Sequence, residues 1–495
     1  MIKIYFTTDT HGFIFPINYA TKQKTNSGVL ACGLEFQKDG NTLIIDAGDT
    51  LQGSPFTKIL WEDTTEGCVI SEVFNQVGYD YVTLGNHDFN YGHNNLKRFV
   101  DNLDAKCVVA NVEILTNDIN IAPYQIHTTE DGTKIGIVGL VTDFVPVWEK
   151  PENLENIRIK DAFESAKTAL SEIKNKCDLT ICIYHGGFEN DLTTGEKLSD
   201  TKENIAYKIA QQLEFDVLLT GHQHMEVVGV DLFGTFCMQL PANAKQYGYI
   251  EIENDEFRAE IRTPKSCEVK VQQNWLDLEQ KVNTWLDLPL GTFDTEILPL
   301  DKLTLATDGS LLANFCNQVQ LEFSGADFSC TALANDLIGF EKEVSIREIM
   351  AAYQYPNNLK VLKVTPQILK MALERCAQYF ELENGSLTIS KKFLQPKVEH
   401  YNYDFFMGFD YKFDIKNPVG ERVICIEKDG KPLENKEYTI VMSDYRATGT
   451  GGYSFYKDCE IVEEFDTDTQ KLIIDYIKKY GYIEICKDKN FSIVN

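Results

Sequence analysis

The chain has 495 residues, with 75 Asp or Glu against 47 Lys or Arg, so its formal net charge is −28. Hydrophobic residues make up 43% and charged residues 25%, which is typical of a globular protein and excludes a disordered or fibrous chain. The acidity argues against a protein that binds duplex nucleic acid or an anionic membrane, because both need a basic surface.

Targeting and redox signals are sparse. No stretch reaches the roughly 20 apolar residues that span a membrane, and Met1–Asp9 reads as a strand with no secretory leader. The 13 cysteines are scattered without a C-x-x-C pair, which favours free thiols in a reducing compartment. We therefore expect a cytoplasmic protein, or an exported one if a leader has been removed.

The first 260 residues alternate apolar runs with helical patterns, which predicts a layered α/β domain. Helices are expected at 161–173 and 201–213, and antiparallel strands at 233–238 and 249–253 near its end. Runs flanked by turn residues predict strands buried on both faces. These runs are Ile2–Thr7, Thr42–Ile45, Tyr81–Leu84, Cys107–Ala110, Lys134–Val141, Leu179–Tyr184 and Val217–Thr220.

The pattern predicts a first domain over 1–265, a linker with one amphipathic helix over 266–291, and a second mixed α/β domain over 292–495. The linker helix should stop at Leu288-Pro289-Leu290-Gly291. In the second domain we expect helices near 310–319, 346–352 and 366–380. Strands are expected near 359–364, 411–413, 422–427 and 438–442.

Five polar clusters directly follow predicted strands. Since sites in open α/β sheets form beyond the carboxyl ends of strands, the clusters can converge on one crevice. They are Asp9-Thr10-His11, Asp46-Ala47-Gly48-Asp49, Gly85-Asn86-His87-Asp88, His185-Gly186-Gly187 and Gly221-His222-Gln223-His224.

The clusters hold enough carboxylate, amide and imidazole ligands for two divalent cations. Such ligands suit Zn, Mn or Fe, and a carboxylate such as Asp49 can bridge two ions. Two ions clamp a phosphate ester and activate water for in-line attack. A single His after a strand is usually structural, and we interpret His93, His127 and His400 in that way.

The ordered motifs D-x-H, G-D, G-N-H-D, H and G-H-x-H resemble those of the calcineurin-like metallophosphoesterase superfamily. The resemblance implies a four-layer β-sandwich flanked by helices. It further implies that Asp9, His11, Asp49 and His224 hold one metal ion, and that Asp49, Asn86, His185 and His222 hold the other. His87, next to Asn86 in the catalytic motif, would stabilise the phosphoryl oxygens and act as general acid.

The domain order resembles that of the 5′-nucleotidase family, whose second domain stacks the nucleotide base between two aromatic rings. Residues 353–358 resemble the first aromatic loop, and residues 443–449 resemble the second. The resemblance implies that Tyr355 and Tyr445 bind the substrate base. The alternative is that both tyrosines are loop anchors.

Several details favour one branch of this family. Residues 85–92 resemble the signature of 2′,3′-cyclic-nucleotide 2′-phosphodiesterase/3′-nucleotidases, with Asp88 in place of Glu. The 5′-nucleotidase branch commonly has Asp where Asn90 stands. Residues 449–452 lack its ribose-binding Asp, and residues 331–336 lack the Arg of its phosphate clamp. Arg446 could instead supply a positive charge or lie solvated at the surface.

We therefore expect a two-metal hydrolase that opens 2′,3′-cyclic nucleotides and dephosphorylates 3′-nucleotides by attack of a metal-bridging hydroxide. One alternative is a 5′-nucleotidase/UDP-sugar hydrolase on the same fold. Another is a non-catalytic nucleotide-binding module, which the intact ligand set disfavours.

Overall fold

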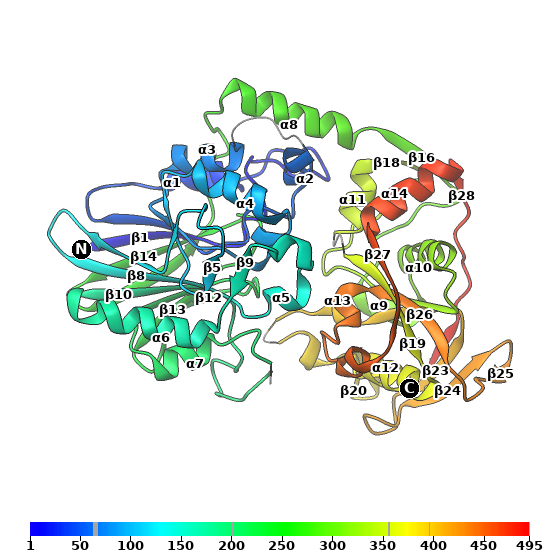
Figure 1. Cartoon of the computed structure of the whole chain (residues 1–495). Coiled ribbons are helices and arrows are strands. Elements are labelled where there is room, and N and C mark those ends of the chain that lie inside the picture. Colours follow the sequence, from blue (N-terminus) through cyan, green and yellow to red (C-terminus); the bar gives the residue numbers. More distant parts are fainter. Residues whose placement is uncertain (63–67, 200, 355–356, 396, 495) are drawn as a thin grey trace. The chain divides into compact units, whose positions relative to one another are not determined.

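The computed structural model describes residues 1–62, 68–199, 201–354, 357–395 and 397–494. The chain forms two compact units, Met1–Val282 and Asn283–Asn495, each with its own sheets (Figure 1). The division falls within α8 (Gln273–Leu286), inside the segment 266–291 that the sequence assigns to the linker. All 13 cysteines are free thiols.

Two sheets form the centre of the first unit. In spatial order, the seven-stranded sheet contains β15 (Glu256–Arg262), β14 (Tyr247–Glu253), β1 (Ile2–Thr7), β2 (Thr42–Asp46), β3 (Tyr81–Val82), β4 (Lys106–Val108) and β6 (Ile121–Ala122). The six-stranded sheet contains β12 (Val227–Leu232), β13 (Thr235–Gln239), β11 (Val217–Thr220), β10 (Leu179–His185), β8 (Lys134–Val141) and β7 (Tyr124–Thr128). A separate pair consists of β5 (Val112–Ile114) and β9 (Ile157–Ile159).

The apolar runs are explained by burial on both faces of a strand. In β10, Ile181 and Ile183 belong to the core shared with β1 and β2, whereas Cys182 and Tyr184 belong to the core under α6 and α7. Successive side chains of a strand point to opposite faces, so a strand covered on both sides must be apolar throughout. Each such side chain contributes about 1.5–3 kcal/mol when fully buried.

Helices cover the outer face of each sheet, which gives the four layers that the resemblance implied (Figure 1). The helices are α1 (Val29–Glu35), α2 (Pro55–Glu62), α3 (Val69–Val77), α4 (Gly92–Asp101), α5 (Val145–Trp148), α6 (Ala162–Ile173) and α7 (Ala206–Gln212). The helix predicted at 201–213 begins only at Ala206, because the preceding residues turn toward the polar clusters. There Glu203 contacts His222, and the Asn204 side chain accepts the Gly187 N–H at 2.6 Å.

The second unit is built around a mixed five-stranded sheet. Its order is β22 (Asp404–Met407), β17 (Phe328–Ala332), β26 (Tyr438–Ser443), β19 (Asn358–Val364) and β27 (Ile461–Asp468). Smaller sheets contain β25 (Lys431–Pro432), β24 (Val423–Lys428), β23 (Asp410–Asp414) and β29 (Phe491–Val494); β18 (Glu343–Ser345), β16 (Pro289–Phe293) and β28 (Tyr482–Ile483); and β20 (Phe380–Glu383) with β21 (Ser386–Ile389).

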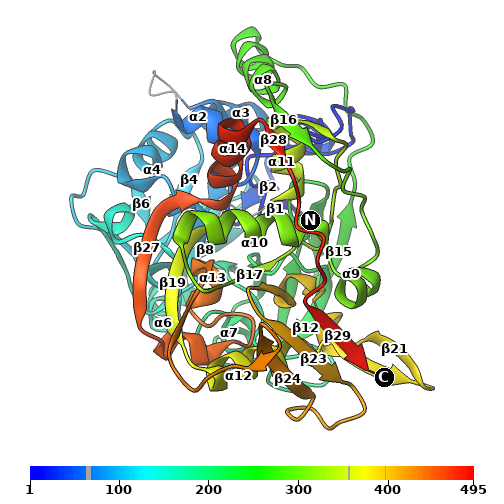
Figure 2. The same ribbon diagram turned by 90° about the vertical axis from the view of Figure 1, so that its right-hand side faces the viewer.

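Helix α10 (Leu311–Ser324) packs on β17 and β26, and Figure 2 shows it lying across this sheet. The remaining helices are α9 (Lys302–Asp308), α11 (Ile346–Ala352), α12 (Pro366–Ala377), α13 (Asp444–Ala447) and α14 (Thr469–Tyr480). The helix predicted at 366–380 ends at Ala377, and Phe380 begins β20 instead. Within the described residues, no helix is both long and apolar enough to cross a membrane.

Candidate metal centre and nucleotide loops

The polar clusters of the first unit converge as the sequence predicts. Each lies at or just beyond the carboxyl end of a strand in one of the two facing sheets, and Asn86 lies in the short 3-10 helix η1 (Asn86–Phe89) after β3. Two groups of side chains are each close enough to hold one cation, namely Asp9 with His11 and His224, and Asp49 with His185 and His222.

The first group points its ligand atoms at one place. Nε2 of His11 lies 3.1 Å from Nε2 of His224, which lies 3.3 Å from Oδ1 of Asp9. Nδ1 of His11 donates to the Gln52 carbonyl at 2.8 Å, so the lone pair of this neutral imidazole is on Nε2.

The second group has the same logic. Nδ1 of His185 donates to the Ala47 carbonyl at 2.7 Å, which leaves Nε2 at 3.1 Å from Oδ2 of Asp49. In His222 the two ring nitrogens have the opposite roles. Nε2 contacts Glu203 at 3.0 Å, and Nδ1 lies 2.9 Å from Oδ1 of Asn86. The structure thus brings all seven predicted ligands into two adjacent groups.

Two observations show that cations fit these groups. Nε2 of the fully buried His185 has no hydrogen bond of good geometry, although the Asp49 carboxylate is adjacent. Burial by itself would lower the pKa of His185, but Asp49 and Asp9 outweigh it and raise the pKa to about 10. A proton on His185 thus balances the buried carboxylates in the way that a divalent cation would.

The carboxylates respond in the opposite direction. Burial would raise the pKa of Asp49, yet His185 and His87 hold it well below its ordinary value. Asp9 behaves in the same way, because His185 and His224 outweigh its burial and lower its pKa. Both groups are therefore charged acceptors, as metal ligands must be.

Backbone strain is concentrated at this centre. Five of the seven ligand candidates have positive φ values between 48° and 70°, namely Asp9, His11, Asp49, His222 and His224. A non-glycine residue in this region costs about 1–3 kcal/mol and persists where the surroundings over-determine it. Gly48 meets a stricter demand, since its φ is 90° and a Cβ would lie 2.3 Å from the Gly85 nitrogen.

Asp88, which replaces the Glu of the resembling signature, anchors the loops that carry the ligands. Its buried carboxylate accepts the backbone N–H groups of Gly85, Asp49, Thr50 and Leu51 at 2.7–2.9 Å. Burial and then the nearby Asp49 raise its pKa to about 6. The shorter side chain thus fixes the Asp49 loop to the start of η1.

Sequence reasoning missed two residues that support His222. Glu203 binds its Nε2, and the Trp148 ring stacks on its imidazole with centroids 5.4 Å apart. A carboxylate on the outer nitrogen of a histidine ligand fixes its tautomer and raises its basicity. Neither residue belongs to a local motif, and Glu203 lies in a segment whose pattern predicts a helix.

His87 lies beside the first group, with its ring centroid 5.6 Å from that of His11. Its backbone N–H donates to Oδ1 of Asp49 at 2.7 Å, and its Nδ1 lies 2.8 Å from Oδ1 of Asn90. The three histidines predicted to be ordinary have other partners. His93 contacts Asp118, His127 contacts Tyr81 and His400 contacts Tyr379.

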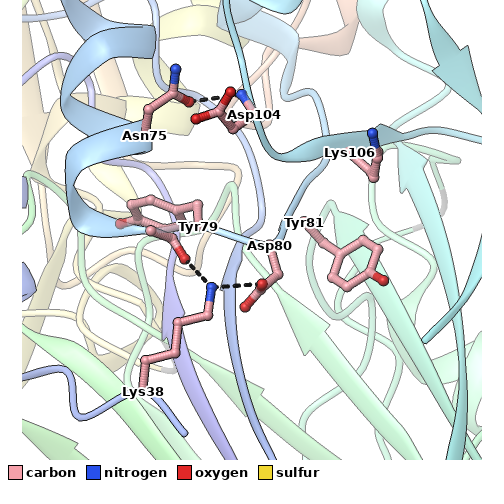
Figure 3. A pocket seen from close by; sticks show the side chains of 8 residues that line it. Lys38, Asn75, Tyr79, Asp80, Tyr81, Asp104 and Lys106 are labelled. Atoms are coloured by element: carbon pink, nitrogen blue, oxygen red, sulfur yellow. Dashed lines mark hydrogen bonds and ion pairs between the residues drawn. The ribbon is translucent and has the colours of Figure 1, made fainter. Parts of the chain in front are cut away.

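A hollow in this unit lies at the opposite, amino-terminal end of β3 and β4 (Figure 3). It has a volume of about 410 Å³. Its polar groups bond to one another: Lys38 donates to Asp80 and to the Gly78 carbonyl at 2.7 Å, and Asn75 accepts the Asp104 N–H. Among the described residues that line this hollow, none is a predicted metal ligand.

In the second unit, the predicted nucleotide loops meet at one edge of the five-stranded sheet. Parallel strands β17 and β26 end there, and antiparallel β19 begins there, with Leu359 opposite Ser443. Gln354 connects two of the loops by donating to the Asp336 carbonyl at 2.7 Å. Tyr445 is half-buried in α13, whereas Tyr355 lies outside the described residues.

Arg446 is neither solvated nor available to substrate, which corrects both sequence alternatives. Its side chain is 3% exposed, and the guanidinium pairs with the buried Asp404 at 2.9 Å. It also donates to the carbonyls of Thr450 and Tyr401 and covers the Tyr453 ring. Arg446 thus stabilises the second aromatic loop from within the core of the second unit.

A lysine side chain lies next to residues 331–336, the stretch that lacks the Arg of the phosphate clamp. The half-buried Lys302, at the start of α9, donates to the Ala334 carbonyl, and its burial lowers its pKa to about 8. Sequence reasoning could not select it, because it lies about thirty residues before the loop that it contacts.

Comparisons with known proteins agree with this architecture. The chain matches the calcineurin-like phosphoesterase family over residues 2–226 and the 5′-nucleotidase C-terminal domain over residues 289–458. It is 24% identical to the trifunctional nucleotide phosphoesterase protein YfkN of Bacillus subtilis, over 99% of this chain and 39% of that protein. It thus spans about two fifths of that relative.

Two other relatives match over most of their length. A 2′,3′-cyclic-nucleotide 2′-phosphodiesterase/3′-nucleotidase of Haemophilus influenzae is 22% identical, over 100% of this chain and 87% of that protein. A solved structure assigned as a 5′-nucleotidase from Staphylococcus aureus is 29% identical, covers 100% of both chains and has a TM-score of 0.89. The chain belongs to the 5′-nucleotidase family, with an N-terminal calcineurin-like metallophosphoesterase domain, and is a metal-dependent nucleotide phosphoesterase.

Proposed function

We propose that this enzyme opens 2′,3′-cyclic nucleotides and removes the 3′-phosphate of the product. The observation that carries the proposal is the pairing of His87 with the amide of Asn90, where the 5′-nucleotidase branch commonly has a carboxylate. Relatives named as 2′,3′-cyclic-nucleotide 2′-phosphodiesterase/3′-nucleotidases support it, since they match across most of their length.

The proposed ligand roles combine the two groups of side chains with the family resemblance. Asp9, His11, Asp49 and His224 would hold one ion, and Asp49, Asn86, His185 and His222 the other, with Zn, Mn or Fe as the candidate metals. When bound, the two ions clamp the phosphate and supply an activated water. Asp49 would be shared by both ions, and the strained loops would hold the ligands in place before substrate arrives.

His87 would act on the leaving group. Its ring lies beside His11 and the Asp49 loop, so it can donate a proton from Nε2 to the departing ribose oxygen while Nδ1 stays on Asn90. Protonation matters because a ribose alkoxide is a poor leaving group. Asn86, which precedes His87 in η1, contacts His222.

In the second unit, the loops at the edge of β17, β26 and β19 would bind the nucleotide. Tyr445 and Tyr355 would stack on the base, which contributes about 1–3 kcal/mol per base in other systems. Lys302 would supply the positive charge that residues 331–336 lack. The Lys302→Ala variant should then raise KM for nucleotides without changing the bound metal.

A substrate panel tests the proposal. Purified enzyme is incubated with 2′,3′-cyclic AMP, 3′-AMP, 5′-AMP and UDP-glucose, with Mn or Zn added or with a chelator, and nucleosides and nucleotides are separated by chromatography. Metal-dependent turnover of the cyclic ester and 3′-AMP is expected. Preferential turnover of 5′-AMP and UDP-glucose would favour the alternative 5′-nucleotidase, which the similarity to the Staphylococcus aureus structure supports.

The role of His87 has its own test. The His87→Asn variant should lose about 10²–10⁴-fold in kcat yet still bind two metal ions. A variant with unchanged kcat would rule out His87 as the general acid.

A further inference from the structure

A carboxylate lies directly behind the amide that contacts His87. Oε2 of Glu149, the residue after α5, accepts Nδ2–H of Asn90 at 2.6 Å. Oε1 of Glu149 accepts Nδ2–H of Asn153 at 2.7 Å and the Lys150 N–H at 2.8 Å. Asn153 also donates to the Asn90 carbonyl at 2.9 Å, so both ends of this connection are fixed.

Only one arrangement of donors and acceptors satisfies the hydrogen bonds from Glu149 through Asn90 to His87. A carboxylate only accepts hydrogen bonds, so Glu149 requires the Nδ2 end of the Asn90 amide. The opposite amide orientation would place Oδ1 of Asn90 against Oε2 of Glu149, two acceptors 2.6 Å apart. Oδ1 must therefore face Nδ1 of His87, which in turn must carry a proton.

We infer that Glu149 is the positioning residue of the leaving-group acid, and that it acts through Asn90 to keep a proton on Nδ1 of His87. Nε2 is then the ring atom that exchanges a proton with the substrate. In a carboxylate–histidine pair the carboxylate contacts the histidine directly. Here the Asn90 amide lies between the Glu149 carboxylate and His87. The inference rests on the proposed role of His87.

The chain offers matched variants for a kinetic test. Glu149→Ala removes the acceptor, and Glu149→Gln replaces it with an amide whose nitrogen also donates, so neither variant dictates the amide orientation of Asn90. Glu152→Ala removes the same charge from an exposed site three residues later. Each variant is assayed with the preferred nucleotide and with bis(p-nitrophenyl) phosphate, whose leaving group is a stable anion that needs no proton.

With the nucleotide, Glu149→Ala should lower kcat about tenfold, a part of the 10²–10⁴-fold effect of acid catalysis, with KM within about twofold. With bis(p-nitrophenyl) phosphate it should stay within about twofold of the parent. Glu149→Gln should follow Glu149→Ala on both substrates, whereas Glu152→Ala should stay within about twofold of the parent on both. Equal losses on both substrates, or no loss on either, would overturn the inference.

A reciprocal exchange tests the order of donors directly. Asn90→Asp alone places two carboxylates against each other and should lower nucleotide turnover more than Glu149→Ala does. In the double variant with Glu149→Gln, the new amide can donate to the carboxylate introduced at position 90, which still accepts from His87, so turnover should recover at least threefold. A double variant no better than Asn90→Asp would contradict this order.

A readout without turnover separates this inference from the proposed function. Ring-nitrogen NMR of the ¹⁵N-histidine-labelled protein, assigned with His87→Asn, should show His87 in the Nδ1–H form in the parent and mixed tautomers in Glu149→Ala. Unchanged tautomers would overturn the role of Glu149. If the tautomers change but His87→Asn does not distinguish the two leaving groups, the proposed role of His87 fails instead.

Discussion

The two units carry their functional residues in different ways. In the first, the seven ligand candidates are mostly buried and five have strained backbones, and hydrogen bonds hold the outer nitrogens of His11, His185 and His222. In the second, Tyr445 is half-buried on a short helix, and the rigid parts are the groups beneath it, Arg446 and Asp404. Metal chemistry depends on fixed atoms, whereas base stacking needs only an aromatic face.

The largest expected effect comes from substituting Asp49, which we propose to be shared by both ion sites. Asp49→Ala should lower kcat about a thousandfold or more, because it removes several kcal/mol of metal-assisted stabilisation. Metal analysis should find fewer than two ions per chain. Asp104→Ala, in the hollow of Figure 3, is the control and should keep both ions. Two ions retained in Asp49→Ala would refute the bridging role.

In the second region, the substitution with the largest expected effect should lower the free energy of unfolding and leave the metal sites intact. Arg446→Ala leaves Asp404 buried and unpaired, which should cost about 3–5 kcal/mol of unfolding free energy. Chemical denaturation measures this loss, and the metal content should stay at two ions. Arg258→Ala breaks an exposed pair with Glu256 and should cost less than about 1 kcal/mol. Equal stability of the two variants would show that the buried pair is not a brace.

Tyr445→Ala sharpens the comparison, because it should affect recognition alone. Loss of stacking should lower kcat/KM for nucleotides by about 1–3 kcal/mol, or roughly 5- to 150-fold. Turnover of bis(p-nitrophenyl) phosphate, which has no base, should be unchanged, and Tyr445→Phe should keep most of the activity. A parallel fall on both substrates would count against a base contact.

The smallest effect concerns pH. Burial and then the nearby Lys302 lower the pKa of His400 to about 4. The unfolded chain, with an ordinary pKa of about 6.5, therefore binds more protons between these values, and stability should fall as pH decreases from 6.5 to 4. Denaturation of His400→Gln should show a shallower fall than the parent. Identical slopes would contradict the shift.

The sequence predicted much of the fold because buried strands leave a clear pattern. The strands at Ile2–Thr7, Lys134–Val141 and Val217–Thr220 have the predicted bounds, since strands covered on both faces must be apolar. Prediction was poorer where a segment serves the site. The helix expected from residue 201 begins at Ala206, because Glu203 and Asn204 bind the ligand loops.

The sequence by itself determined that this protein is a metal-dependent phosphoesterase, because each candidate ligand follows its strand at short range and the residue types are specific. Only the tertiary structure decided which residues support that chemistry. Glu149 lies about sixty residues from His87, and Glu203 lies in another segment from its target, so no local pattern marks either residue. Arg446 was ambiguous for the same reason, since its burial depends on Asp404 in a distant strand.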